Sequence, residues 1–159
     1  MSSISFGSFT KSRVEAFSDG LFAIIVTLLV FDLKLPAREL SGNADFFGAL
    51  FAILPKILSW MNSFLIVCVI WMNHHRLMEM FEGIDAGIFW FNNLLLMFVS
   101  LIPFPTAVLG EHFRIPASVS FYGICLAFAA SGFTAIRYYV LSKPHLLKKD
   151  VNLSAFKKG

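Results

Sequence analysis

The stretch RVEAFSDGLFAIIVTLLVF, from Arg13 to Phe31, sets the fold class of this chain. A helix rises about 1.5 Å per residue, so this stretch is long enough to reach across about 30 Å of hydrocarbon. It nevertheless carries Glu15 and Asp19 near its start and Thr27 in its middle. An ionised side chain inside lipid costs at least about 2.5 kcal/mol unless it is paired or shielded. We therefore predict a membrane-spanning helix whose polar side faces protein.

Three further apolar stretches have the length of membrane spans. The chain is 57% hydrophobic and 14% charged, whereas about a quarter of the residues of soluble proteins are charged. These features predict an all-α integral membrane protein, a helical bundle with about four transmembrane helices. The predicted spans are Val14–Leu33, Phe47–Met72, Ile88–Leu109 and Ile115–Leu141. Residues 1–142 form the predicted transmembrane domain, and residues 143–159 form a basic tail.

The basic residues are divided unevenly between the two sides of the membrane. With an even number of spans both tails share a side, which carries Lys11, Arg13, Arg76, Lys143, Lys148, Lys149, Lys157 and Lys158. The opposite side has Lys34, Arg38 and Arg114. The positive-inside rule therefore predicts a multi-pass protein of the cell membrane with both termini in the cytoplasm. Residues 1–12 lack the apolar core of a cleavable signal peptide, so the first span is expected to stay in place.

The basic tail allows two interpretations. It could bind nucleic acid, or it could hold the topology by lying beside anionic lipid. The second is much the commoner role for a basic segment that directly follows a membrane span, and no nucleic-acid partner is expected.

A helical wheel divides the first span into two faces. One face carries Phe17, Gly20, Ile24, Thr27 or Leu28, and Phe31, whereas Ser18 and Asp19 point roughly 120–140° away from Ile24. Antiparallel threading brings the end of the second span and the start of the third beside Asp19. The candidate hydrogen-bond donors there are Arg13, Trp71, Asn73, His74, His75, Trp90, Asn92 and Asn93. We infer that Phe-Ser-Asp clamps the first helix to the second and third.

The other face of the first span allows two interpretations. If several copies surround a common axis, Ile24 forms an apolar ring that excludes water and Thr27 a ring of hydroxyls that replaces part of an ion's hydration shell. In the alternative, this face is ordinary packing surface, and the Thr27 hydroxyl bonds the carbonyl four residues earlier in its own helix.

The fourth span is rich in small residues, which let helices approach closely. The predicted contact positions are Ser118, Ser120, Gly123, Ala127 and Ser131. The two cysteines, Cys68 and Cys125, fall inside predicted spans and are expected to be small apolar fillers.

A metal-dependent membrane enzyme is a competing hypothesis, with His74, His75, His112 and His145 as the available ligands. Adjacent histidines on a helix point about 100° apart, and the sequence has no H-x-x-x-H or C-x-x-C pattern. We therefore expect no catalytic activity, no metal site and no cofactor.

The pattern Arg-x-x-x-Phe-Ser-Asp, formed by Arg13, Phe17, Ser18 and Asp19, resembles the signature of the transmembrane protein 175 family of potassium channels. FAIIVTLLV is similar to the rest of that family's first helix, and Trp71, His74 and His75 resemble a later motif. The resemblance covers roughly residues 10–142. It implies a channel domain over residues 1–142, a homotetramer, and passage of potassium and other monovalent cations.

The resemblance also implies roles for individual residues. The pore, lined by the first helix, would have its apolar constriction at Ile24, Leu28 and Phe31 and its potassium preference at Thr27. The implied structural polar network comprises Arg13, Phe17, Ser18, Asp19, Trp71, His74, His75, Asn92 and Asn93. The family repeat has six spans and this chain has four. A non-conducting assembly or regulatory subunit is therefore the alternative function.

Overall fold

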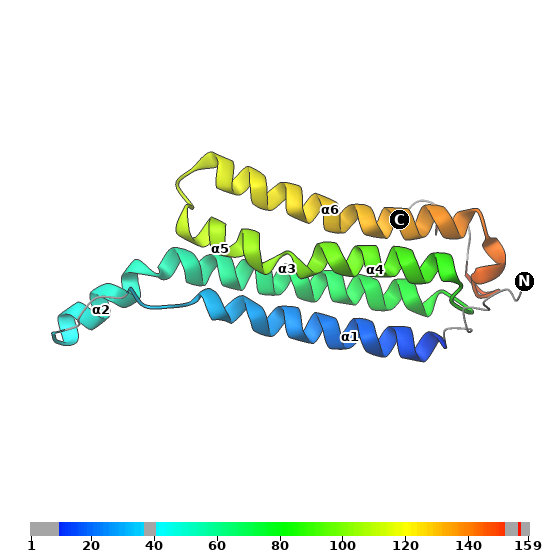
Figure 1. Cartoon of the computed structure of the whole chain (residues 1–159), viewed down its shortest axis with the longest axis horizontal. Coiled ribbons are helices and arrows are strands. Elements are labelled where there is room, and N and C mark those ends of the chain that lie inside the picture. Colours follow the sequence, from blue (N-terminus) through cyan, green and yellow to red (C-terminus); the bar gives the residue numbers. More distant parts are fainter. Residues whose placement is uncertain (1–9, 37–40, 152–155, 157–159) are drawn as a thin grey trace, which may run out of the picture.

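The computed structural model describes residues 10–36, 41–151 and 156 of the chain, and this part consists of helices joined by short turns (Figure 1). In chain order the elements are α1 (Lys11–Leu28), η1 (Leu29–Asp32), α2 (Asn43–Ala52), α3 (Leu54–Glu79), α4 (Ala86–Ser100), α5 (Pro103–Glu111), α6 (Pro116–Leu141) and η2 (Pro144–Leu146). Within the described residues, four segments are long and apolar enough to cross a membrane: Lys11–Asp32, Leu54–Glu79, Ala86–Glu111 and Pro116–Leu141. The predicted all-α membrane bundle is confirmed.

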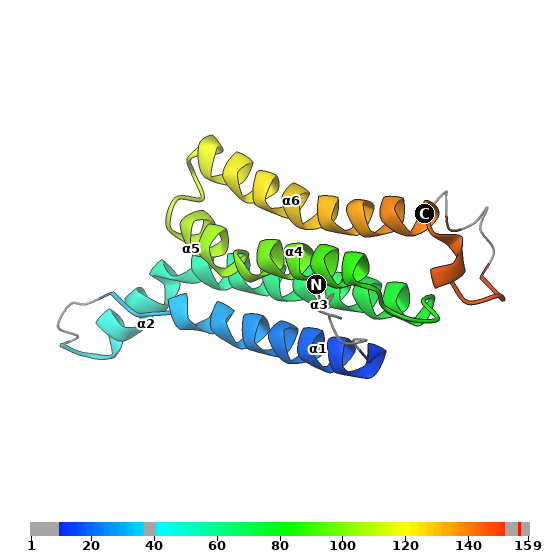
Figure 2. The same ribbon diagram turned by 45° about the vertical axis from the view of Figure 1, so that its right-hand side comes forward.

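The outer helices of the bundle are α1 and α6. In both views α1 lies on one side and α6 on the other, with α3 and α4 between them (Figures 1 and 2). The start of α1 and the end of α6 lie at the same end of the bundle. We call this the basic end, because it carries Lys11, Arg13, Arg76, Lys143, Lys148 and Lys149. Three of the basic residues counted in the topology prediction lie outside the described residues: Arg38, Lys157 and Lys158. The same holds for residues 1–9, on which the signal-peptide prediction depends.

The second predicted span is wrong at both ends. The helix expected to begin at Phe47 is interrupted at Ile53, and residues before it form the separate helix α2. Pro55 occupies the first turn of α3, where its missing N–H breaks no helical hydrogen bond. The span therefore runs from Leu54 to Glu79, and α2 projects beyond the bundle (Figure 1).

The third span is also divided by a proline. α4 ends at Ser100, and Pro103 begins α5. Beyond the break α5 approaches α3 closely: a Cβ atom on Gly110 of α5 would lie 3.0 Å from the Lys56 Cα of α3. This second part of the span thus packs tightly against the start of α3.

The core is built around α4. Its side chains Ile88, Leu95 and Val99 are fully buried, and the helix contacts α1 on one side and α6 on the other. The α4–α6 contact depends on Gly132, where a Cβ atom would lie 2.9 Å from both the Cα and the Cβ of Leu95. Close backbone approach at a small residue is the usual means of helix association in membranes.

Most of the small residues predicted as contact positions of the fourth span do not take part in this α4–α6 contact. Ser118 is buried, but Ser120, Gly123, Ala127 and Ser131 are exposed. The buried face carries Ala129, Gly132, Ile136 and Val140 instead. α6 has small residues on more than one face, so composition alone did not identify the packed one.

The chain after α6 folds back onto the basic end. The Glu82 N–H donates to the Leu146 carbonyl at 2.9 Å, and the Lys148 N–H donates to the Met80 carbonyl at 3.0 Å. Leu146 and Leu147 are buried in the core cluster. The first residues of the predicted basic tail are therefore held against the turn between α3 and α4.

Candidate functional site

One face of α1 is buried and the opposite face is exposed. Val14, Ser18, Phe22, Ile25 and Leu29 recur every three or four residues and pack on the bundle. We call the opposite positions the free face of α1; they are Phe17, Ile24, Thr27 and Leu28 of α1 and Phe31 of η1, which directly follows it. Their exposure is high for long apolar side chains, reaching 59% for Ile24 and 68% for Phe31. The face predicted to line a conduit is thus left uncovered by its own chain.

Thr27 is the only hydroxyl on the free face. Its Oγ1 donates to the Ile24 carbonyl of the same helix at 2.8 Å. The packing interpretation predicted a backbone bond of this kind, but to the carbonyl four residues earlier, that of Ala23. Because the single proton of Thr27 Oγ1 is used in the bond to Ile24, the oxygen keeps its lone pairs for an acceptor role. An oxygen of this kind can face a cation.

A buried polar cluster joins α1, α3 and α4. The Asn92 Nδ2 donates to Ser18 Oγ at 3.1 Å, and the Asn92 Oδ1 lies 2.7 Å from His74 Nε2. Since an amide oxygen only accepts, His74 must carry its proton on Nε2. Ser18 in turn donates to the Val14 carbonyl at 2.9 Å. All three side chains of this Ser18–Asn92–His74 cluster are essentially fully buried.

Asp19 belongs to a second, separate contact. Its Oδ1 accepts a 2.8 Å hydrogen bond from the Trp71 indole, which ties α1 to α3 a second time. Neighbouring residues on a helix point about 100° apart, so Ser18 enters the core while Asp19 stays at the exposed edge. The predicted clamp is present, but it consists of two contacts with different partners.

Several residues predicted for the polar network lie outside it. The Asn93 amide donates to the Phe89 carbonyl of its own helix at 3.0 Å, and His75 lies 3.5 Å from Glu79. Phe17 and Arg13 are exposed, and within the described residues no hydrogen bond joins Arg13 to Asp19. Shared membrane depth does not decide which way a side chain points, so only some of the predicted residues hydrogen-bond to one another, while the His75 ring stacks on Trp71.

A third polar cluster, not foreseen from the sequence, joins α3, α5 and α6. The Thr106 hydroxyl lies 2.7 Å from Ser63 Oγ, which lies 2.8 Å from the Tyr122 hydroxyl. The Asn62 amide also donates to Tyr122 at 3.3 Å. Each of these side chains is a polar residue inside an apolar span. That feature of the sequence could have indicated that they are buried against protein.

An ionic contact lies at the end opposite the basic end. The Lys56 ammonium is 2.8 Å from Glu111 and 4.0 Å from Asp32. Lys56 therefore connects the start of α3 to the end of α5 and to the end of η1. This contact was not predicted from the sequence.

Asp85 organises the basic end. Its Oδ1 accepts from the Ile88 N–H at 2.9 Å and caps α4, while its Oδ2 accepts from Tyr139 and Lys143 at 2.7 and 3.0 Å. Burial alone would raise the pKa of Asp85, but these three hydrogen bonds together outweigh it and lower that pKa. Hydrogen bonds to Tyr139 and Asp85 raise the pKa of Lys143.

This cluster predicts a pH-dependent contribution to stability. A lowered pKa for Asp85 means that its contribution is present above the ordinary carboxyl pKa of about 3.9 and is lost as the pH falls through the lowered value. The raised pKa of Lys143 gives a contribution present below the ordinary lysine value and lost as the pH rises through the raised one. We expect Asp85→Asn to destabilise by roughly 1 kcal/mol near neutral pH, and the difference to vanish in acid. Melting temperature measured against pH tests this, with the exposed Asp150→Asn as the control. A difference that stays constant into acid would contradict the assignment.

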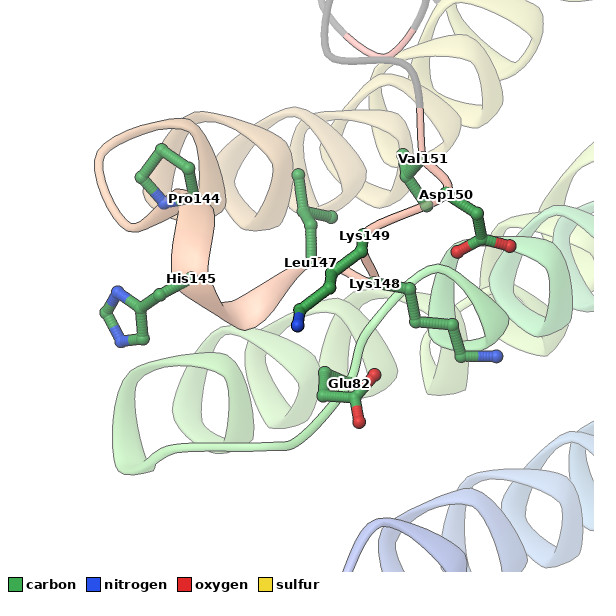
Figure 3. A pocket seen from close by; sticks show the side chains of 8 residues that line it. All are labelled: Glu82, Pro144, His145, Leu147, Lys148, Lys149, Asp150 and Val151. Atoms are coloured by element: carbon green, nitrogen blue, oxygen red, sulfur yellow. The ribbon is translucent and has the colours of Figure 1, made fainter.

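A surface pocket of about 770 Å³ lies at the basic end, away from α1. It is formed by the turn after α3 and the segment after α6, and it contains Glu82, His145, Lys148, Lys149 and Asp150 (Figure 3). Its charges are of both signs, and none of its residues belongs to the free face. It is not part of the candidate ion path.

The histidines considered as metal ligands are dispersed. His74 is bonded to Asn92 and His75 lies beside Glu79, while His112 and His145 lie on other segments. Within the described residues no three His, Cys, Asp or Glu side chains are grouped closely enough to hold a metal.

Comparison with known proteins identifies the family of this chain. The sequence model of the family described as the endosomal/lysosomal potassium channel TMEM175 matches residues 13–103, which include most of α1 and the partners of Ser18 and Asp19. The chain belongs to the TMEM175 family. A potassium channel of Chamaesiphon minutus is 42% identical over 74% of this chain, and a potassium channel of Streptomyces collinus is 34% identical over 91%.

The fold agrees with a solved TMEM175 structure. The crystal structure of a lysosomal potassium-selective channel TMEM175 homolog from Chamaesiphon minutus superimposes with a TM-score of 0.79 and 32% identity, covering 94% of this chain and 80% of that one. The chain spans 60% of the length of the Chamaesiphon relative and 71% of the Streptomyces relative. The residues that the family model matches include Ser18, Asp19, Trp71 and Asn92.

Proposed function

We propose that this chain is a subunit of a potassium-permeable cation channel in the cell membrane, with both termini in the cytoplasm. The α1 helices of four copies surround the ion path, and the permeating ions are potassium and other monovalent cations, with no cofactor. The observation that carries the proposal is the free face of α1, an apolar stripe with a single hydroxyl that its own chain leaves uncovered. The names of the bacterial relatives support the choice of ion.

The free face supplies the two elements that a simple pore needs. Rings of Ile24, Leu28 and Phe31 form a constriction that closes by excluding water, because a narrow apolar passage dewets. A ring of Thr27 oxygens between them replaces part of the hydration shell of a dehydrating cation. The threonine layer therefore sets ion preference, while the apolar rings act as the gate.

The anchors of α1 explain how this face is held outward. Ser18 is fixed from within by Asn92, and Asp19 is fixed at the edge by Trp71. Two contacts about 100° apart on one helix determine its rotation about its own axis. The direction of Ile24 is thereby set by polar groups that never touch the ion.

Potassium flux from loaded liposomes tests the proposal. We expect the reconstituted protein to conduct, and Ile24→Asn to increase flux several-fold because an amide hydrates the constriction. Thr27→Ala should keep potassium flux but reduce the preference for potassium over sodium. The measurement is dye-reported flux in potassium and in sodium gradients.

Leu65→Asn is the matched control, because Leu65 is an exposed apolar residue of α3 at a similar depth. It should leave the flux unchanged when corrected for reconstituted protein. Equal effects of Ile24→Asn and Leu65→Asn would exclude α1 as the pore-lining helix.

The second candidate is a non-conducting assembly or regulatory subunit. Flux indistinguishable from that of empty vesicles, from a protein shown to be folded and oligomeric, would support this candidate over the channel.

A further inference from the structure

A groove between α3 and α6 opens at the basic end, away from α1. Its volume is about 500 Å³. The lining residues that concern its chemistry are Asn73, Arg76, Met80, Phe133, Thr134 and Arg137. The groove therefore combines two guanidinium groups, two uncharged polar side chains and an apolar wall.

The two arginines have no acidic partner in the part of the chain that the structure describes. The ion pairs there are formed by Lys11, Lys56, His75 and Lys143. Glu79, one turn beyond Arg76 on α3, lies 3.5 Å from His75 instead. Arg137 lies over the Phe156 ring, with 5.7 Å between its Cζ and the ring centroid. Two positive charges thus line an open groove without neutralisation.

The position of the groove determines what can neutralise them. Arg76 and Arg137 stand close to the ends of two membrane-spanning helices, at the depth where lipid headgroups lie. Met80 and Phe133 extend the apolar wall of the groove. An anion that carries hydrocarbon chains can satisfy both parts, because its phosphate meets the arginines while its chains follow the apolar wall.

We propose that this groove binds the headgroup of an anionic phospholipid, with its phosphate held between Arg76 and Arg137. The Asn73 amide adds hydrogen-bond donors for the remaining headgroup oxygens. Free inorganic phosphate fits the two arginines but leaves the apolar wall exposed, so the lipid is the ligand that the groove matches. The site is independent of the free face of α1 and does not rest on the channel proposal.

Native mass spectrometry of the detergent-purified protein tests this site. After incubation with phosphatidylglycerol, we expect lipid adducts that survive collisional activation better than those of zwitterionic phosphatidylcholine. Arg76→Gln and Arg137→Gln should each weaken phosphatidylglycerol binding by roughly fivefold, the effect of one basic side chain at an anionic membrane surface. Arg137→Lys keeps the charge and should weaken phosphatidylglycerol binding less than Arg137→Gln does. This comparison separates the charge of Arg137 from its packing on Phe156.

Arg114→Gln is the matched control, because it removes an arginine at the opposite end of the bundle. It should leave phosphatidylglycerol retention unchanged. Equal retention by the wild-type protein and the doubly substituted Arg76→Gln, Arg137→Gln protein would overturn the proposal. Complete displacement of the lipid by excess inorganic phosphate would overturn it as well, since the ligand would then be the free anion. No selectivity for phosphatidylglycerol over phosphatidylcholine in the wild-type protein would have the same consequence.

Discussion

Asn92→Leu is expected to destabilise the folded bundle by about 1–3 kcal/mol, the cost of leaving a buried polar group without a partner. Asn92 is fully buried and is the side chain that bridges Ser18 of α1 and His74 of α3. Leucine has a similar size, so the substitution removes both hydrogen bonds without opening a large cavity. The His74 Nε2 then loses its bonded partner inside the membrane, where no water replaces it. Thermal unfolding in detergent measures the loss.

The adjacent residue supplies the control for this prediction. Asn93 has the same side chain on the same helix, but its amide bonds only the Phe89 carbonyl one turn earlier. Asn93→Leu should therefore change the melting temperature little. A second variant with both Asn92→Leu and His74→Phe should recover part of the stability, because replacing both partners removes the unpaired group. Similar destabilisation by Asn92→Leu and Asn93→Leu would show that the Ser18–Asn92–His74 cluster does not hold α1.

Gly132→Ala is expected to have the second large effect, again a destabilisation of about 1–3 kcal/mol from overpacking. The added methyl group would lie 2.9 Å from the Leu95 Cα, a backbone atom that cannot rotate away. α4 and α6 must then separate along their contact, which also disturbs the buried neighbours Ile136 and Val99. Thermal unfolding and the yield of folded protein report this effect.

The same helix contains a matched glycine. A Cβ atom on Gly123 would have no other atom within 4 Å, and alanine is favoured over glycine in a helix interior by about 0.5–1 kcal/mol. Gly123→Ala should therefore be neutral or slightly stabilising. If Gly132→Ala were equally well tolerated, the close approach of α4 and α6 would not contribute to stability.

Parts of the candidate site could be predicted because they follow from single helices. The wheel separates Ile24 from Ser18 and Asp19, and the structure leaves the first exposed and anchors the other two. Trp71 and Asn92 were among the predicted partners because antiparallel helices of known length place them at the right depth. Depth alone also admitted Asn93 and His75, which bond elsewhere.

The sequence by itself determined that this protein is a helical membrane bundle, how many spans it has, and that α1 carries a polar side and an apolar side. These properties follow from apolar length and from the cost of placing polar groups in lipid, both of which are readable along one segment. Only the tertiary structure decided which donors meet Ser18 and Asp19, which face of α6 packs on α4, and that Lys56 joins Asp32 and Glu111. Each of these depends on the rotation of a helix about its own axis and on its distance from a neighbour. Several rotations satisfy the same pattern of polar and apolar residues, and contacts among all the helices select one of them.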